Sequence, residues 1–150
     1  MTCLIVGYGS LVRGDDGLGQ IIAEALRERM PEADVMAVTQ LAPEIAEPLS
    51  RAAAAFFIDA LDVADLGQTP GELHIRAVTP DAGEGAFSHN VTPERLLTAA
   101  AMLYGGAPPT HLITVVAQTF DIADTLSPAL QAALPGLIKT IEGFIREHSG

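Results

Sequence analysis

Short apolar runs alternate along this chain with segments in which apolar residues recur at helical spacing. Three of the runs are almost entirely apolar, which is typical of parallel strands covered on both faces; they span Cys3–Val6, Ala53–Ile58 and Leu112–Ala117. A shorter run, Asp34–Val38, fits a fourth strand. Residues Glu72–Val78 alternate apolar with polar side chains, which predicts a half-exposed strand and favours an antiparallel edge.

Helical periodicity fills the intervals between these strands. An apolar stripe predicts a helix over residues 17–29, and we expect residues 41–49 to form a helix that is short or kinked because of an internal proline. A Thr-Pro pair predicts the start of a third helix over residues 92–104, and a Ser-Pro pair does the same for a final helix over residues 127–147. Pro135 lies inside the final helix, so we expect it to kink or split there.

Strands that alternate with helices predict an α/β fold. We expect one domain over residues 1–150, a three-layer α/β/α sandwich whose five-stranded sheet is mostly parallel with one antiparallel strand. Ligands of such folds bind beyond the carboxyl ends of the strands, so the residues that follow each strand are the candidates for a site.

Composition narrows the range of functions. The formal net charge of -11 argues against nucleic acid as a partner, because phosphate binding needs a basic surface. Cys3 is the only cysteine, which excludes a disulfide framework and a thiolate metal cluster. No apolar run approaches the ~18 residues of a membrane span, and the first strand leaves no room for a signal peptide. We therefore expect a cytoplasmic protein without membrane insertion.

Acidic residues follow two of the predicted central strands. The glycine-rich stretch Gly7–Gly19 carries Asp15 and Asp16 at the predicted start of the first helix, and Asp59 closes the third strand. His89 precedes the third helix, so it can face the same crevice. Two carboxylates and an imidazole can bind a borderline metal and leave coordination positions open. Structural roles are the alternatives: a helix cap for Asp15 or Asp16, a loop tether for Asp59, and local packing for His89.

Several familiar sites do not fit the pattern. Val12 stands where a dinucleotide fingerprint needs its third glycine, a P-loop lysine is missing, and Ser10 is not followed by the glycine of a nucleophile elbow. A signalling receiver domain also uses an acidic pair and a later aspartate. Its acidic pair, however, follows the first strand directly, and its lysine is missing from residues 117–120. A phosphoacceptor domain is therefore the weaker alternative.

The ordered set of motifs resembles the nickel–iron hydrogenase maturation proteases. The first family motif, Gly-x-Gly-Asn-x-Leu, is similar to Gly7–Val12, with Ser10 in place of the usual asparagine. The segments that resemble the later motifs follow in the family's order: Asp15–Gly19, Gln40–Ala46, Asp59-Ala60, Thr69–Gly71, Ser88-His89, and Phe120 with Leu126–Pro128. The resemblance therefore spans nearly the whole chain.

The resemblance implies a specific activity. Such an endopeptidase removes the C-terminal extension of a [NiFe] hydrogenase large-subunit precursor after nickel insertion, and the substrate supplies the nickel. Asp16, Asp59 and His89 match the family's metal-contacting positions, and we expect the same residues to form the catalytic site. Asp16 or Asp59 would assist the attack of water while nickel orients the cleaved segment. We expect a monomer without an organic cofactor; a non-catalytic nickel-binding chaperone for the same subunit is the other alternative.

Overall fold

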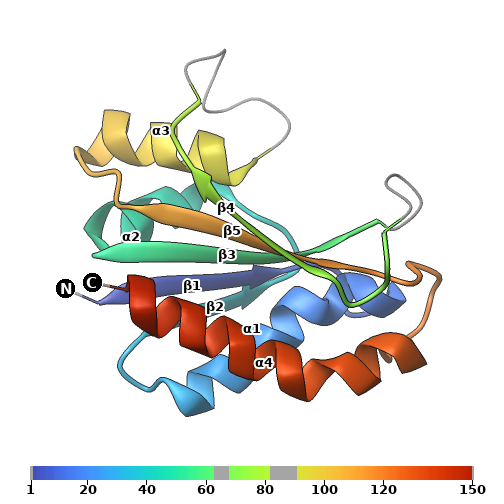
Figure 1. Ribbon diagram of the computed structural model, residues 1–150. Coiled ribbons are helices and arrows are strands. Elements are labelled where there is room, and N and C mark those ends of the chain that lie inside the picture. The colour runs from blue at the N-terminus through green and yellow to red at the C-terminus, as the bar shows by residue number, and fades with distance from the viewer. Residues whose placement is uncertain (1, 63–67, 82–90, 150) are drawn as a thin grey trace.

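A computed structural model describes residues 2–62, 68–81 and 91–149, which form a five-stranded sheet with helices on both faces (Figure 1). The strands are β1 (Cys3–Tyr8), β2 (Asp34–Val38), β3 (Ala54–Leu61), β4 (Leu73–Val78) and β5 (Thr110–Val116). Their order across the sheet is β2-β1-β3-β5-β4, and only β4 runs antiparallel to its neighbour. The predicted α/β class, five strands and antiparallel edge are confirmed.

Two strands extend further than their apolar runs predict. Strand β3 continues to Leu61 because its last residues still pair with β5, so Asp59 lies within the strand, opposite Thr114. Strand β1 likewise continues to Tyr8 by pairing with Val38 of β2. Asp59 therefore stands on paired strand backbone rather than in a free loop.

Helices cover the sheet in two layers. One face carries α1 (Leu18–Arg29) and α4 (Pro128–His148), and the other carries α2 (Ala46–Arg51) and α3 (Pro93–Tyr104) (Figure 1). Two 3-10 turns, η1 (Gly14–Gly17) and η2 (Pro43–Ile45), precede α1 and α2. Each face of the sheet has its own hydrophobic core, and successive strand residues point into opposite cores. Ile5 and Phe56 face α1 and α4, whereas Val6 and Phe57 face α2 and α3.

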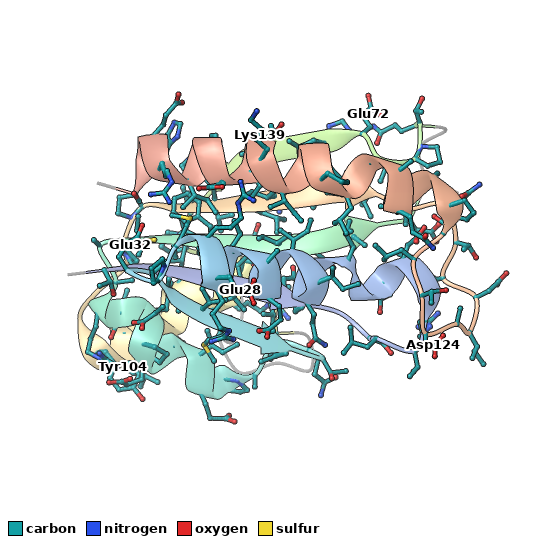
Figure 2. The ribbon with its side chains drawn as sticks, turned by 90° about the horizontal axis from the view of Figure 1, so that it is seen from below. Glu28, Glu32, Glu72, Tyr104, Asp124 and Lys139 are labelled. Atoms are coloured by element: carbon teal, nitrogen blue, oxygen red, sulfur yellow. The ribbon has the colours of Figure 1, made fainter. Side chains whose placement is uncertain are left out.

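The predicted split of the last helix is wrong, because α4 is a single helix of 21 residues. Pro135 is exposed, so the main-chain hydrogen bond that it removes lies on the solvent side of the helix. Leu130 and Ile141, on either side of Pro135, are completely buried and hold the helix on the sheet. Helices α1 and α4 run side by side over this face (Figure 2).

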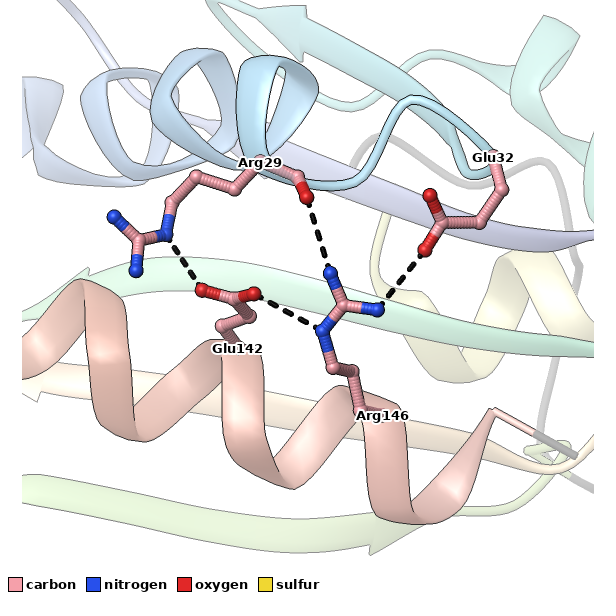
Figure 3. A network of polar contacts seen from close by, with 4 residues as sticks. All are labelled: Arg29, Glu32, Glu142 and Arg146. Atoms are coloured by element: carbon pink, nitrogen blue, oxygen red, sulfur yellow. Dashed lines mark hydrogen bonds and ion pairs between the residues drawn. The ribbon is translucent and has the colours of Figure 1, made fainter.

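A polar network ties the ends of these two helices together (Figure 3). Glu142 of α4 accepts hydrogen bonds from Arg29 and Arg146, and Arg146 also donates to Glu32 and to the Arg29 carbonyl oxygen. Arg29, Arg146 and Glu32 are about half exposed, so solvent screens these ion pairs strongly. None of the described helices combines the length and apolar character that a membrane span requires.

Helix α1 crosses the sheet at very close range, and this approach sets the position of η1. A Cβ atom on Gly19 would lie 2.9 Å from the Tyr8 nitrogen and would overlap the carbonyl oxygens of Tyr8 and Ile58. Only glycine therefore fits at this point of α1. The contact places η1, which directly precedes α1, beside the carboxyl ends of β1 and β3.

Candidate functional site

A pocket of about 640 Å³ lies at the carboxyl ends of β1 and β3. One side is formed by the ends of these strands and by η1, with Tyr8, Gly9, Asp16 and Asp59. The other side consists of residues 39–43, which lead from β2 into η2, and of the residues before α3, Val91 and Thr92. The volume falls in the range of ligand sites in proteins. Among the described residues that line it, none has a cationic side chain.

Asp16 reaches the pocket from η1, where it is half-buried. Its Oδ2 accepts a hydrogen bond of 2.9 Å from the Ser10 amide. The chain can pass this close because Gly9 has a φ of 138°, and a Cβ there would overlap the Asp16 carbonyl oxygen. The buried side chain of Gln20 donates a 2.7 Å hydrogen bond to the Gly9 carbonyl oxygen and so fixes the loop to α1.

Asp59 faces the pocket from β3. Its Oδ1 accepts a 2.8 Å hydrogen bond from the Ala60 amide. Burial raises the pKa of Asp59 from 3.8 to about 6; hydrogen bonds from Ala60 and Tyr8 oppose the shift, and the Asp16 charge adds to it. Burial and Asp59 together raise the pKa of Tyr8. A carboxyl group with a pKa near neutrality suits general acid–base chemistry.

Asp15 does not reach the pocket, although it is the neighbour of Asp16. It is fully buried, and its Oδ1 accepts a hydrogen bond of 2.7 Å from the Ser127 amide. Its Oδ2 accepts hydrogen bonds from the amides of Gln118 and Thr119 and from the Ser127 hydroxyl. The interpretation of either aspartate as the cap of α1 is wrong, since Gly17 is the N-cap and no side chain caps it.

The structure thus brings together two of the three predicted site residues. Asp16 and Asp59 line one pocket and influence each other electrostatically. His89 lies outside the described residues, so the imidazole of the predicted ligand set stays a prediction. Within the described part of the chain, no three metal-binding side chains cluster together.

Sequence reasoning missed two residues that support the site, Tyr8 and Gln20. Tyr8 is next to Gly7 on β1, and the pairing of Gly7 with Ile58 places Tyr8 beside Asp59. In the sequence, Gln20 is a polar residue directly after the glycine-rich stretch, at a position that the structure shows to be buried. Such a residue usually needs a hydrogen-bonding partner, which here is the loop itself.

The protein is thus an α/β protein in which two carboxylates share a pocket at the carboxyl ends of neighbouring parallel strands. No protein-family model and no curated protein sequence matches the chain. Solved structures do. The hydrogenase maturating endopeptidase HybD from E. coli superposes with a TM-score of 0.75 at 20% identity, over 98% of this chain and 93% of that chain.

Two archaeal structures match similarly. The [NiFe] hydrogenase maturation protease HycI from Thermococcus kodakarensis KOD1 gives a TM-score of 0.73 at 20% identity, over 97% of this chain and 92% of that chain. Hydrogenase 2 maturation peptidase from Thaumarchaeota archaeon SCGC_AB-539-E09 gives 0.68 at 20% identity, over 97% and 98%. The chain therefore has the fold of the hydrogenase maturation endopeptidases, as the resemblance of its motifs implies.

Proposed function

We propose that this chain is an endopeptidase of hydrogenase maturation. It would remove the C-terminal extension of a [NiFe] hydrogenase large-subunit precursor that already carries nickel. The observation that carries this proposal is the pairing of Asp16 with Asp59 in one pocket that has no cationic side chain among its described lining residues. The shared fold, over nearly the whole chain, supports the same function.

The two carboxylates fit a cation delivered by the substrate. Asp16 accepts one main-chain hydrogen bond at Oδ2, and Asp59 accepts one at Oδ1 and a further one from the Tyr8 hydroxyl. A carboxylate has about four acceptor positions, so each group keeps lone pairs for a metal ion. Binding of a cation would lower the raised pKa of Asp59 and remove the repulsion between the two groups. In this proposal His89 supplies a nitrogen ligand, and nickel-free precursor is not cleaved because the pocket stays without its cation.

The carboxylates also offer a route for water attack. Ionised Asp59 would accept a proton from the water molecule that adds to the scissile carbonyl carbon. The same proton would then pass to the departing amine as the carbon–nitrogen bond breaks. Asp16 would hold the nickel-bearing segment in place. The Ser10 amide fixes the Asp16 carboxylate, and the Gln20 side chain fixes the adjoining loop at the Gly9 carbonyl oxygen.

The test follows the mass of the precursor. Nickel-loaded and nickel-free large-subunit precursors are incubated with the protein, and we expect a C-terminal peptide to be lost only from the loaded form. Asp16→Asn, Asp59→Asn and His89→Ala should abolish this loss, whereas Asp124→Asn, at an exposed position outside the pocket, should not. Normal cleavage by both aspartate variants would refute the proposed site.

The alternatives predict other outcomes of the same experiment. A nickel-binding chaperone would bind the loaded precursor without mass loss. A receiver domain would form an aspartyl phosphate with acetyl phosphate, but the described structure disfavours it. Its strands would run in the order 2-1-3-4-5, whereas β4 forms an antiparallel edge here. Lys139, the sole lysine, is exposed on α4 and does not line the pocket.

A further inference from the structure

An exposed apolar surface lies on the loop that leads to Asp16. It consists of Leu11, Val12 and Ile122, which are 49%, 62% and 91% exposed, and we refer to it as the loop patch. Single exposed apolar side chains are ordinary, but apolar side chains that gather in one patch are typical of a contact site for a partner. Ile122 is the most exposed of the large apolar residues described in this chain.

Main-chain pairing holds the loop patch together. Arg13 and Ala123 form a parallel β-bridge, which places Val12 beside Ile122. The Ala123 amide donates a hydrogen bond of 3.0 Å to the Val12 carbonyl oxygen, and the Gly14 amide donates one of 2.9 Å to the Ala123 carbonyl oxygen. The loop patch is therefore a fixed surface formed by two segments that are distant in sequence.

The loop patch is continuous with the candidate site. Leu11 packs against Gly17, the residue after Asp16. Ser10, on the other side of Leu11, donates the amide hydrogen bond that holds the Asp16 carboxylate. A protein that places a segment in the pocket would thus meet the loop patch next to it.

Size distinguishes between the occupants of this surface. A stable interface between two proteins buries about 800 Å² on each partner, which three side chains do not provide. A second copy of this chain, held by the loop patch alone, is therefore disfavoured. A partner already anchored in the adjoining pocket needs only a small additional contact. The exposed charges around the loop patch are Asp121, Asp124 and Arg13, so acidic groups outnumber basic ones and a partner with an apolar centre and a mainly basic rim fits it.

We propose that the loop patch is a docking surface for the folded body of the large-subunit precursor, separate from the segment that enters the pocket. This inference rests on the proposed function, since that function supplies the partner. The precursor would place apolar side chains against Val12 and Ile122. Docking there would raise affinity for the whole precursor and leave the chemistry at Asp16 and Asp59 unchanged.

The experiment measures binding and cleavage separately. The dissociation constant for nickel-loaded precursor is determined by biolayer interferometry for wild type, Val12→Asp, Ile122→Asp and Ile122→Ser. We expect each variant to weaken binding at least ~10-fold, because a polar group replaces a desolvated apolar contact. Ile122→Leu, which keeps a large apolar side chain, should bind with wild-type affinity. Met102→Asp is the matched control, since Met102 is 74% exposed on α3 and does not belong to the loop patch.

Cleavage kinetics complete the test. In the loop-patch variants we expect KM to rise with the dissociation constant while kcat stays within ~2-fold. Unchanged binding in all three polar variants, or an equal loss in Met102→Asp, would overturn the docking surface and leave the proposed protease intact. Weaker binding by the loop-patch variants, together with a wild-type protein that never shortens the precursor, would support the docking surface and refute the proposed protease. Self-association that only the loop-patch variants lose would assign the surface to a second copy and also overturn the proposal.

Discussion

Replacing Asp15 tests most directly whether Asp15 has a structural role while its neighbour Asp16 serves the pocket. Asp15 is fully buried and accepts hydrogen bonds from Gln118, Thr119 and both the amide and the hydroxyl of Ser127. Ser127 is also the N-cap of α4. One carboxylate therefore joins η1, the segment after β5 and the first turn of α4, so that its loss affects three elements at once.

The expected magnitude follows from these four contacts. A hydrogen bond to a charged group contributes about 1.5–3 kcal/mol, and the contributions of neighbouring bonds are not additive. Removing the carboxylate leaves several donors without their acceptor, as when one partner of a buried charged pair is deleted, so we expect Asp15→Ala to cost about 3–5 kcal/mol. Asp15→Asn retains one acceptor oxygen and should cost about 1–3 kcal/mol.

Urea unfolding followed by far-UV circular dichroism measures these free energies, since the chain has no tryptophan to report by fluorescence. Asp124→Ala, at an exposed position near the same segment, should change stability by less than about 0.5 kcal/mol. Asp16→Asn should also remain within about 1 kcal/mol of wild type, because an amide oxygen can still accept from Ser10. An Asp15→Ala protein as stable as Asp124→Ala would refute the anchoring role.

Four further substitutions test other parts of the structure. Asp59→Asn should raise the free energy of unfolding at pH 7 by about 1–3 kcal/mol, because burial raises the Asp59 pKa to about 6 and one pKa unit corresponds to about 1.4 kcal/mol. Ionisation of Asp59 lowers the free energy of unfolding of the wild type as pH rises from about 4 to 6. Urea titrations should therefore show the stability advantage of Asp59→Asn shrinking below pH 6, and an equal advantage at pH 4.5 and 7.5 would contradict the raised pKa. Gly19→Ala should cost at least about 3 kcal/mol or prevent folding, whereas Gly143→Ala, which meets no atom within 4 Å, should stabilise α4 by about 0.5–1 kcal/mol in thermal unfolding. Gln20→Leu should cost about 1–2 kcal/mol and reduce kcat more than it raises KM, as the Gly9 loop loses its hydrogen bond; unchanged kcat would exclude a positioning role.

Local patterns were sufficient to predict the frame of this protein. Continuous apolar runs at Cys3–Val6 and Ala53–Ile58 predict parallel strands covered on both faces, and the alternation over Glu72–Val78 predicts the antiparallel edge; the structure contains all three strands. The error at Pro135 has a simple cause. Helix continuity there depends on which face of α4 is exposed, and that is decided by the packing of the whole helix on the sheet.

The roles of the acidic pair depended on contacts that no local pattern contains. Asp15 is held by residues more than a hundred positions later in the chain, Gln118 and Ser127. The sequence motif alone presents two equivalent acids at a helix start. Successive residues of a 3-10 turn point about 120° apart, so only one of the two can face the pocket. Which one does so is decided by the distant segment that binds the other.

This arrangement also bears on the proposed chemistry. The loop that carries Asp16 is held by Gln20 through Gly9, by the contacts of Asp15, and by the pairing with Ala123. Asp16 is thereby held in place independently of any substrate. Asp59, in contrast, has a raised pKa because its charge is buried near a second carboxylate. A cation that enters between two fixed carboxylates relieves their repulsion and stabilises the site. Under the proposed function, only the metal-bearing precursor provides this stabilisation, which gives a physical reason for a protease to distinguish loaded from unloaded substrate.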